Sequence, residues 1–314
     1  MHYSREYFKK EIIDGFEVSS MMKRCRAAQM EVLEQFDAIC RRHNIRYFLG
    51  YGTLLGAVRH GGFIPWDDDI DIWMFREDRD RFVNETSADL SLAGLELVSP
   101  YNDSTYANLT FRLINTRNYC LREDFLKRYW MFPFMAGLDL FTLDYVPRDN
   151  NLLQELCTVM ISANALAQEW VKPEVPVIDK REAYDQLTAL LGLEQVEDSM
   201  IPNQLWQLSD LLGGTYGSED GDMLVEWAYY VQENHKIFRK EWFAKEVYLD
   251  FEGIKFPCPE YYNEVLSAEF GEDYMVPKNI PGDHEYPYYK AEHARMLRDF
   301  ENMGIACPEI YRSI

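Results

Sequence analysis

The segment at residues 67–72 constrains the fold of this chain more than any other, because it alternates carboxylates with large apolar side chains. It reads Asp-Asp-Asp-Ile-Asp-Ile and has a tryptophan on each side. Side chains of a β-strand point alternately to its two faces, so Asp69 and Asp71 share one face while the isoleucines point into a core. The pattern predicts a strand with one buried face and with paired carboxylates on the other.

Paired carboxylates on one face of an apolar strand repel each other and lose hydration, which is costly unless a cation lies between them. Magnesium prefers hard oxygen ligands, often one or two carboxylates together with substrate phosphates. The segment therefore predicts a metal site for Mg²⁺ or Mn²⁺ at Asp69 and Asp71. The alternative is a solvated acidic turn at the start of a strand, which the neighbouring isoleucines and tryptophans disfavour.

A glycine-rich turn precedes the acidic segment. Residues 50–56 read Gly-Tyr-Gly-Thr-Leu-Leu-Gly and open a short predicted helix over 53–59. Backbone amides at a helix start bind phosphate, Thr53 adds a hydroxyl, and Arg59 adds a charged fork. A Gly-x-Gly alone is typical of an ordinary turn. Combined with the acidic strand it indicates phosphoryl chemistry, because that chemistry needs an anion cradle and a charge-neutralising metal.

These two features together resemble a known family. The stretch over residues 52–72, GTLLGAVRHGGFIPWDDDIDI, is similar to the signature of the LicD family, which comprises phosphorylcholine transferases of the nucleotidyltransferase (DNA polymerase β-like) superfamily and is related to fukutin-type transferases. Shorter stretches at 137–144, 251–257 and 270–277, with His284 beyond them, resemble later motifs of the family in the same order. The resemblance extends from residue 45 to residue 285.

The resemblance implies specific roles for the acidic residues. Asp69 and Asp71 would be the paired metal ligands and catalytic carboxylates. Asp139 would be the third carboxylate, on a neighbouring strand, and Asp144 is the second choice because its surroundings read as a strand end. Gly52 stands at the glycine of the superfamily's Gly-Ser/Thr pair.

The resemblance also implies a nucleotide- and phosphate-binding set. Its members would be Gly52, Thr53, Arg59, Arg112 and His284. Arg112 stands where the family commonly has lysine, which keeps the charge and changes its geometry. The chain departs from the family pattern at residues 50–52, where a tyrosine separates two glycines, and its spacing from glycine to aspartate is longer than is usual for the superfamily.

The implied reaction is transfer of phosphocholine from CDP-choline to a hydroxyl of a cell-surface glycan, a teichoic acid or lipopolysaccharide precursor that is lipid-linked or free. The reaction would depend on metal and release CMP. CDP-ribitol or CDP-glycerol as the donor is one alternative, and a nucleotidyltransferase acting on a small molecule is another. A degenerate relative that only binds ligand is disfavoured because Asp69, Asp71 and Asp139 are all present.

Aromatic side chains make up 15% of the residues. A quaternary ammonium such as choline has no hydrogen-bond donors, so its recognition relies on ring faces. We therefore expect an aromatic cage near the predicted site, although each ring taken alone fits ordinary core packing. The candidates are Tyr129, Trp130, Phe132, Tyr274 and Tyr286.

Composition limits the classes of partner that the protein can bind and the cell compartment in which we expect it. The 314 residues carry a net charge of −21, which argues against nucleic acid and anionic lipid as charge-driven partners. No signal peptide and no apolar run long enough for a membrane helix is visible, so we expect a cytoplasmic protein without an integral membrane segment, working near the inner face of the membrane. The six cysteines show no paired spacing and are expected to be reduced.

Periodicity predicts an α/β (α+β) fold, with a nucleotidyltransferase-type mixed sheet flanked by helices and a helical insertion. The predicted helices cover residues 20–43 and 76–90. The predicted strands cover residues 45–49, 70–74, 95–99, 107–114 and 138–143. The predicted organisation is a nucleotidyltransferase-like core over 1–148, a mainly helical region over 149–246, and a C-terminal segment over 247–314 that folds back on the core.

Overall fold

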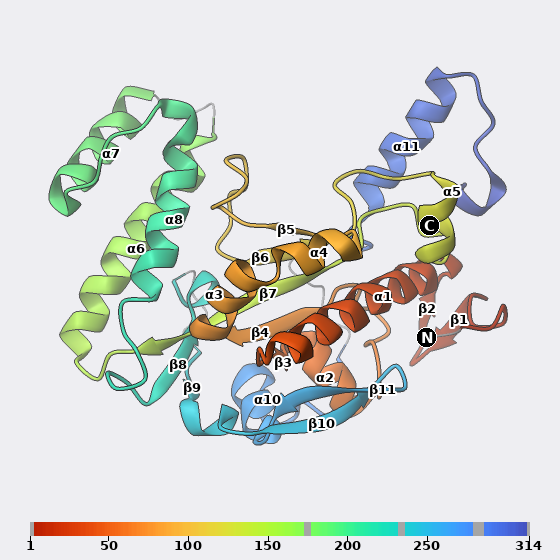
Figure 1. The fold of residues 1–314 in the computed structure, drawn as a ribbon, viewed down its shortest axis with the longest axis horizontal. Coiled ribbons are helices and arrows are strands. Elements are labelled where there is room, and N and C mark those ends of the chain that lie inside the picture. The colour runs from red at the N-terminus through yellow and green to blue at the C-terminus, as the bar shows by residue number, and fades with distance from the viewer. Residues whose placement is uncertain (1–2, 173–176, 232–235, 279–285, 313–314) are drawn as a thin grey trace.

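The computed structural model describes residues 3–172, 177–231, 236–278 and 286–312, and it is built around one mixed β-sheet (Figure 1). The strands follow the order β3–β4–β7–β6–β5, and β8 and β9 extend the sheet beyond β7. This arrangement confirms the predicted α/β class. The strands are β3 (Phe48–Leu49), β4 (Asp71–Phe75), β5 (Glu96–Val98), β6 (Phe111–Ile114), β7 (Gly137–Val146), β8 (Met223–Glu226) and β9 (Phe238–Arg239).

Strand β7 is the centre of the sheet. It pairs in parallel with β4, and it pairs antiparallel with β6 near its start and with β8 near its end. With ten residues, β7 is long enough to pair with β4 on one side and with both β6 and β8 on the other. The register of these pairings determines which side chains meet at the site.

Helix α1 (Ser20–His43) has the bounds predicted from its apolar periodicity. The Ser19 hydroxyl accepts the N–H of Met22, and Asn44 ends the helix in a left-handed conformation. The predicted helix over 76–90 is instead two helices, α3 (Arg76–Glu85) and α4 (Ser87–Ala93). The break falls at Thr86, whose hydroxyl donates to the carbonyl of Phe82 and so competes with the helical hydrogen bonds.

The other elements surround this core. Helix α2 contacts β4 and β10, and α10 contacts α2. Helix α11 and the pair α6 and α8 lie toward opposite ends of the molecule (Figure 1). Their bounds are β1 (Glu11–Ile13), β2 (Phe16–Val18), α2 (Tyr51–Arg59), α5 (Glu123–Arg128), β10 (Glu246–Phe251), β11 (Ile254–Pro259), α10 (Tyr262–Phe270) and α11 (Lys290–Asn302).

The helices that follow β7 have a core of their own. Helices α6 (Asn150–Trp170), α7 (Val177–Leu191) and α8 (Ile201–Gly213) bury apolar side chains such as Met160 and Leu205 against one another. The chain then returns to the sheet through β8 and the short helix α9 (Trp227–Tyr230). Buried Val146 and Val225 belong to this second core, so it meets the sheet along the end of β7.

Two expectations from the sequence concern the cysteines and membrane-spanning helices. All six cysteines are free, as their scattered spacing predicts. Within the described ranges, no helix combines the length and the apolar composition that crossing a lipid bilayer requires.

Candidate active site

A row of three charged side chains crosses the middle of the sheet. The parallel pairing of β4 with β7 sets Asp71 opposite Asp139, and the antiparallel pairing of β6 with β7 sets Arg112 opposite the same Asp139. Residues directly opposite on neighbouring strands project from the same face. We call Asp71, Asp139 and Arg112 the charged row. It brings the predicted carboxylates of two strands together with a predicted phosphate-binding arginine.

Arg112 and Asp139 bind each other in this structure. The Arg112 Nε lies 2.8 Å from one carboxylate oxygen of Asp139, and its Nη2 lies 3.1 Å from the other. The negative charge of Asp139 raises the pKa of Arg112 further above its ordinary value. The predicted phosphate clamp and the predicted third carboxylate thus form one ion pair.

The acidic loop, which we define as residues 64–69, ends at the row. One ligand oxygen from each of Asp67, Asp68 and Asp69 lies within 4.8 Å of the others. Burial raises the pKa of Asp67, and repulsion from Asp69 adds to the effect. Burial likewise raises the pKa of Asp71, followed by repulsion from Asp69 and Asp139. Crowded carboxylates of this kind are stabilised by a hard divalent cation, so the donor set fits Mg²⁺ or Mn²⁺.

Asp67 is a site residue that the sequence analysis missed. It shares the two-residue period of Asp69 and Asp71, so the same alternation could have identified it. Gly52 makes room for it, because a Cβ atom at position 52 would lie 2.4 Å from Asp67 Oδ2. The glycine of the predicted phosphate turn therefore also has a steric role toward the acidic loop.

The start of α2 is tied to the first residue of β4. The Thr53 hydroxyl accepts the backbone N–H of Asp71 at 2.8 Å, and the N–H of Gly50 donates to the Asp71 carbonyl at 2.9 Å. Thr53 is buried and still has its own O–H available to donate. The glycine turn and the acidic strand, which the sequence predicts to act together, are joined directly.

Arg59 and His284 are the two remaining residues of the predicted phosphate-binding set. Arg59 ends α2, and its Nη1 donates to the carbonyl of Tyr274 at 2.8 Å, so the guanidinium holds the 274–276 segment. Burial lowers the pKa of Arg59. His284 lies outside the described residues.

Comparison with known proteins decides the family. Residues 44–142, which contain α2, the acidic loop and the charged row, match the family described as LicD/FKTN/FKRP, nucleotidyltransferase domain. Residues 44–142 are a LicD-family nucleotidyltransferase domain. A chain with this domain is a phosphotransferase.

Two sets of relatives show how far the similarity extends. The chain is 27% identical over 271 residues to the lipopolysaccharide cholinephosphotransferase LicD of Haemophilus influenzae. This match covers 84% of this chain and 94% of that protein. It is 41% identical over 54 residues to the ribitol 5-phosphate transferase FKRP of Homo sapiens and of Mus musculus. That second match covers 17% of this chain and 11% of each relative.

Each aromatic residue predicted for a choline cage contacts a residue outside the predicted set. Tyr129 and Phe132 are buried in the main core, and the Trp130 ring lies 5.1 Å from that of Tyr3. The Tyr274 hydroxyl donates to Asn263, and the Tyr286 ring lies 5.4 Å from that of Phe16.

A different aromatic group lies beside the charged row. Trp73 and Phe141 pair across β4 and β7 two residues beyond Asp71 and Asp139, and so they share the face of the row. The Tyr51 ring lies 5.0 Å from the Phe141 ring and 4.7 Å from the Trp73 ring, and Tyr229 stacks on Phe141 at 5.8 Å. None of these rings is among the predicted cage residues, because the register that aligns them with the carboxylates is not visible in the chain.

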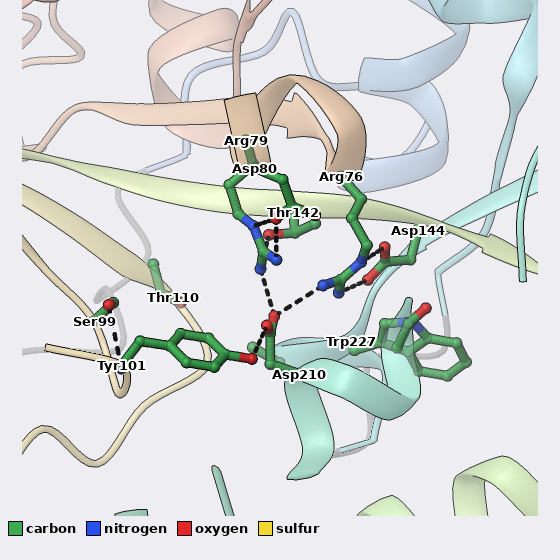
Figure 2. Close-up of polar contacts among 12 residues, drawn as sticks. Arg76, Arg79, Asp80, Ser99, Tyr101, Thr110, Thr142, Asp144, Asp210 and Trp227 are labelled. Carbon is green, nitrogen blue, oxygen red and sulfur yellow. Dashed lines mark hydrogen bonds and ion pairs between the residues drawn. The ribbon is translucent and has the colours of Figure 1, made fainter. Parts of the chain in front are cut away.

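Asp144, the second choice for the third carboxylate, binds an arginine outside the charged row. It lies inside β7 rather than at a strand end, and Arg76 binds both of its oxygens at 2.5 and 2.6 Å (Figure 2). Arg79 and the Tyr101 hydroxyl reach Asp210 of α8 in the same buried cluster. The cluster fastens the α6–α8 helices to the sheet and leaves Asp139 as the carboxylate of β7 in the charged row.

Proposed function

We propose that this LicD-family phosphotransferase moves phosphocholine from CDP-choline to a hydroxyl group of a cell-surface glycan and releases CMP. The observation that carries the proposal is the pairing of Asp71 with Asp139 beside the crowded carboxylates of the acidic loop. The similarity over nearly the whole length of a protein named as a cholinephosphotransferase supports choline as the transferred alcohol.

The acidic loop and β4 are the parts of the chain that would hold a divalent cation. Asp69 and Asp71 are the assigned ligands, and Asp67 is added because it lies against Asp69. A bound Mg²⁺ supplies charge neutralisation to the diphosphate of the donor. The N-terminal turn of α2, with Gly52 and Thr53, would orient the same diphosphate.

We assign the transfer step to the residues of the charged row. The acceptor hydroxyl oxygen bonds to the phosphorus of the phosphocholine group, the bond from that phosphorus to the oxygen of CMP breaks, and the hydroxyl proton passes to Asp139. Arg112 leaves Asp139 for the donor phosphate as the donor binds. The exchange keeps Asp139 paired in the absence of substrate and makes it a proton acceptor only once phosphate is present.

The ribitol 5-phosphate transferases among the relatives favour a second donor, CDP-ribitol, with CDP-glycerol as its smaller analogue. The match to them covers only 54 residues, which is 17% of this chain. Donor choice is therefore the point at which the two proposals differ.

Product analysis tests the proposal. The purified chain with Mg²⁺ is given CDP-choline, CDP-ribitol or CDP-glycerol together with lipopolysaccharide or teichoic acid precursors, and CMP and labelled glycan are quantified. We expect CMP in equal amount to labelled choline on the glycan. Faster CMP release from CDP-ribitol would favour the second donor. Pyrophosphate formation from CTP and an alcohol phosphate would identify a nucleotidyltransferase and overturn the proposal.

A further inference from the structure

The acidic loop is held by a buried arginine of α1. The Nη2 of Arg26 donates to three backbone carbonyls of the loop, at 2.8 Å to Ile64, 2.9 Å to Pro65 and 3.0 Å to Asp67. Arg26 is only 5% exposed. A buried guanidinium bound to neutral carbonyls is costly to desolvate, so its presence needs a compensating role. Its positive charge lies next to the carboxylates of the loop, which it stabilises.

Gln29, one helical turn after Arg26, also binds a backbone carbonyl of the acidic loop. Its Nε2 donates to the carbonyl of Asp68 at 2.8 Å, and its side chain is 1% exposed. Arg26 and Gln29 are three residues apart and therefore project from the same side of α1. They interrupt the apolar stripe of the helix, and together they hold four of the carbonyls between residues 64 and 68.

Asp68 itself points to a third contact. Its carboxylate accepts the backbone N–H of Tyr288 at 2.8 Å and is fully buried. The Tyr288 hydroxyl in turn donates to the carbonyl of Met135 at 2.6 Å, two residues before β7 begins. Asp68 thus links the acidic loop through the C-terminal segment to the strand that carries Asp139.

The turn between β10 and β11 supports the other end of the loop. A Glu252 side-chain oxygen accepts the N–H of Phe63 at 3.2 Å, and the N–H of Glu252 donates to the carbonyl of Gly61 at 2.9 Å. Glu252 belongs to the stretch at 251–257 that the sequence analysis noted. Contacts from α1, from this turn and from Tyr288 therefore converge on the few residues that precede Asp69.

We propose that the three consecutive aspartates have different tasks, and that Asp68 is a positioning residue rather than a metal ligand. Arg26, Gln29 and Tyr288 hold the loop through its carbonyls and through Asp68, so that Asp67 and Asp69 face the cation. The inference rests on the proposed metal site. The competing account makes Asp68 a third ligand, because its oxygen lies within 4.8 Å of the other two.

Two substitutions at one position separate these accounts. Asp68→Asn keeps a carbonyl oxygen that can accept the Tyr288 N–H, whereas Asp68→Ala removes the acceptor. A positioning role predicts that Asp68→Asn changes Mn²⁺ affinity by about threefold or less, and that Asp68→Ala weakens it roughly 10–100-fold, the range for partners that orient metal ligands. A ligand role predicts that the two variants lose affinity equally, and to the same extent as Asp69→Asn.

A second series of variants tests the hydrogen bonds from Arg26 of α1 to the acidic loop. Arg26→Met is expected to weaken Mn²⁺ binding roughly 10–100-fold, and Arg26→Lys, which keeps a donor and the charge, to recover part of that loss. Arg24→Met is the matched control, because Arg24 lies on the same helix and donates to a carbonyl outside the loop, that of Trp130, at 2.7 Å. Arg24→Met should bind Mn²⁺ as the wild type does.

The measurement is Mn²⁺ titration of the metal-free full-length chain by electron paramagnetic resonance, with circular dichroism to establish that each variant is folded. The expected order of affinity is wild type, Asp68→Asn, Asp68→Ala, Asp69→Asn. Equal losses in both Asp68 variants, or wild-type affinity in Arg26→Met and Asp68→Ala alike, would overturn the inference. Wild-type affinity in Asp69→Asn would instead overturn the metal site of the proposed function, so the two failures are distinguishable.

Discussion

Arg112 on β6 grips both carboxylate oxygens of Asp139 on β7, at 2.8 and 3.1 Å, in the centre of the candidate site. The pair lies next to Asp71 in the charged row, where an unpaired Asp139 would repel a second buried carboxylate. The arginine therefore stabilises the paired carboxylates, and under the proposed function it would move onto the donor phosphate when the donor binds.

Arg112 is expected to contribute mainly through its charge. Arg112→Lys, the residue common in the LicD family at this position, should keep CMP release within about tenfold of the wild type, because an ammonium still reaches a phosphate as a point charge. Arg112→Met should lose more than about 100-fold, because one uncompensated donor charge remains in the transition state. Steady-state CMP release from CDP-choline checks both. Equal activity in wild type and Arg112→Met would exclude Arg112 from the reaction.

Gly52 is expected to tolerate no side chain. In Gly52→Ala the new Cβ would meet Asp67 Oδ2 at 2.4 Å, so the carboxylate must move away from Asp69. Overpacking of this kind costs about 1–3 kcal/mol of folding free energy, and Mn²⁺ affinity should fall with it. Urea unfolding and Mn²⁺ titration measure the two effects.

Gly217→Ala serves as the control for Gly52, because its Cβ would also face a carboxylate oxygen, that of Asp220, at an ordinary 3.9 Å. We expect wild-type stability and wild-type Mn²⁺ binding in this variant. A Gly52→Ala variant that behaves in the same way would contradict the steric role assigned to Gly52.

The buried arginine cluster at the end of β7 should be worth several kilocalories per mole. Asp210→Ala leaves Arg79, which is 5% exposed at its side chain, and Arg76 without their shared partner (Figure 2). Breaking a buried ion pair from one side costs about 3–5 kcal/mol. Urea unfolding should show this loss. Asp222→Ala, which removes the exposed partner of Arg148, should cost far less, because a solvated ion pair contributes little to stability, and equal losses in the two variants would contradict the role of the cluster.

Glu226 should make the folded state less stable as pH rises. Burial raises its pKa to about 7, although the N–H groups of Ala228 and Tyr229 partly oppose the shift. The unfolded chain releases this proton near pH 4.5, so between that pH and about 7 the folded state binds more protons and loses stability with increasing pH. The full effect is roughly 3 kcal/mol and is constant above pH 7.

Glu226→Gln removes this titration, so its loss of stability between pH 5 and pH 7.5 should be smaller than that of the wild type. Denaturant unfolding at the two pH values measures the difference. Glu241→Gln, at an exposed position, should retain the wild-type dependence. A pH dependence in Glu226→Gln identical to that of the wild type would show that Glu226 does not titrate in this range.

Features that depend on neighbours in the chain were predictable. Helix α1 begins and ends at the predicted residues, because its apolar stripe and its capping serine are local signals. The alternation at residues 69–72 predicted that Asp69 and Asp71 lie close together, and Asp69 does raise the pKa of Asp71 by repulsion, although β4 begins only at Asp71. The glycine turn before them is hydrogen-bonded to Asp71 through Thr53. Asp67 follows from the same period and needed only that the alternation be extended by two residues.

Features set by the register of distant strands were not predictable. The ion pair of Arg112 with Asp139 depends on how β6 and β7 align. The stacking of Tyr229, which follows β8, on Phe141 depends instead on how β7 and β8 align. Nothing in the spacing of the aromatic residues reports that alignment. Arg26 and Gln29 did leave a signal, because two polar residues on the apolar side of α1 are unexpected unless they are buried for a purpose.

The most direct test of the proposed chemistry is CMP release by the Asp71→Asn variant. The wild type and the variant are given CDP-choline, a glycan acceptor and Mg²⁺, and CMP formation is followed together with unfolding in urea. We predict that Asp71→Asn folds and loses at least about 1,000-fold in turnover, because it removes a ligand charge at the centre of the site. A folded Asp71→Asn enzyme that releases CMP at the wild-type rate would contradict the account.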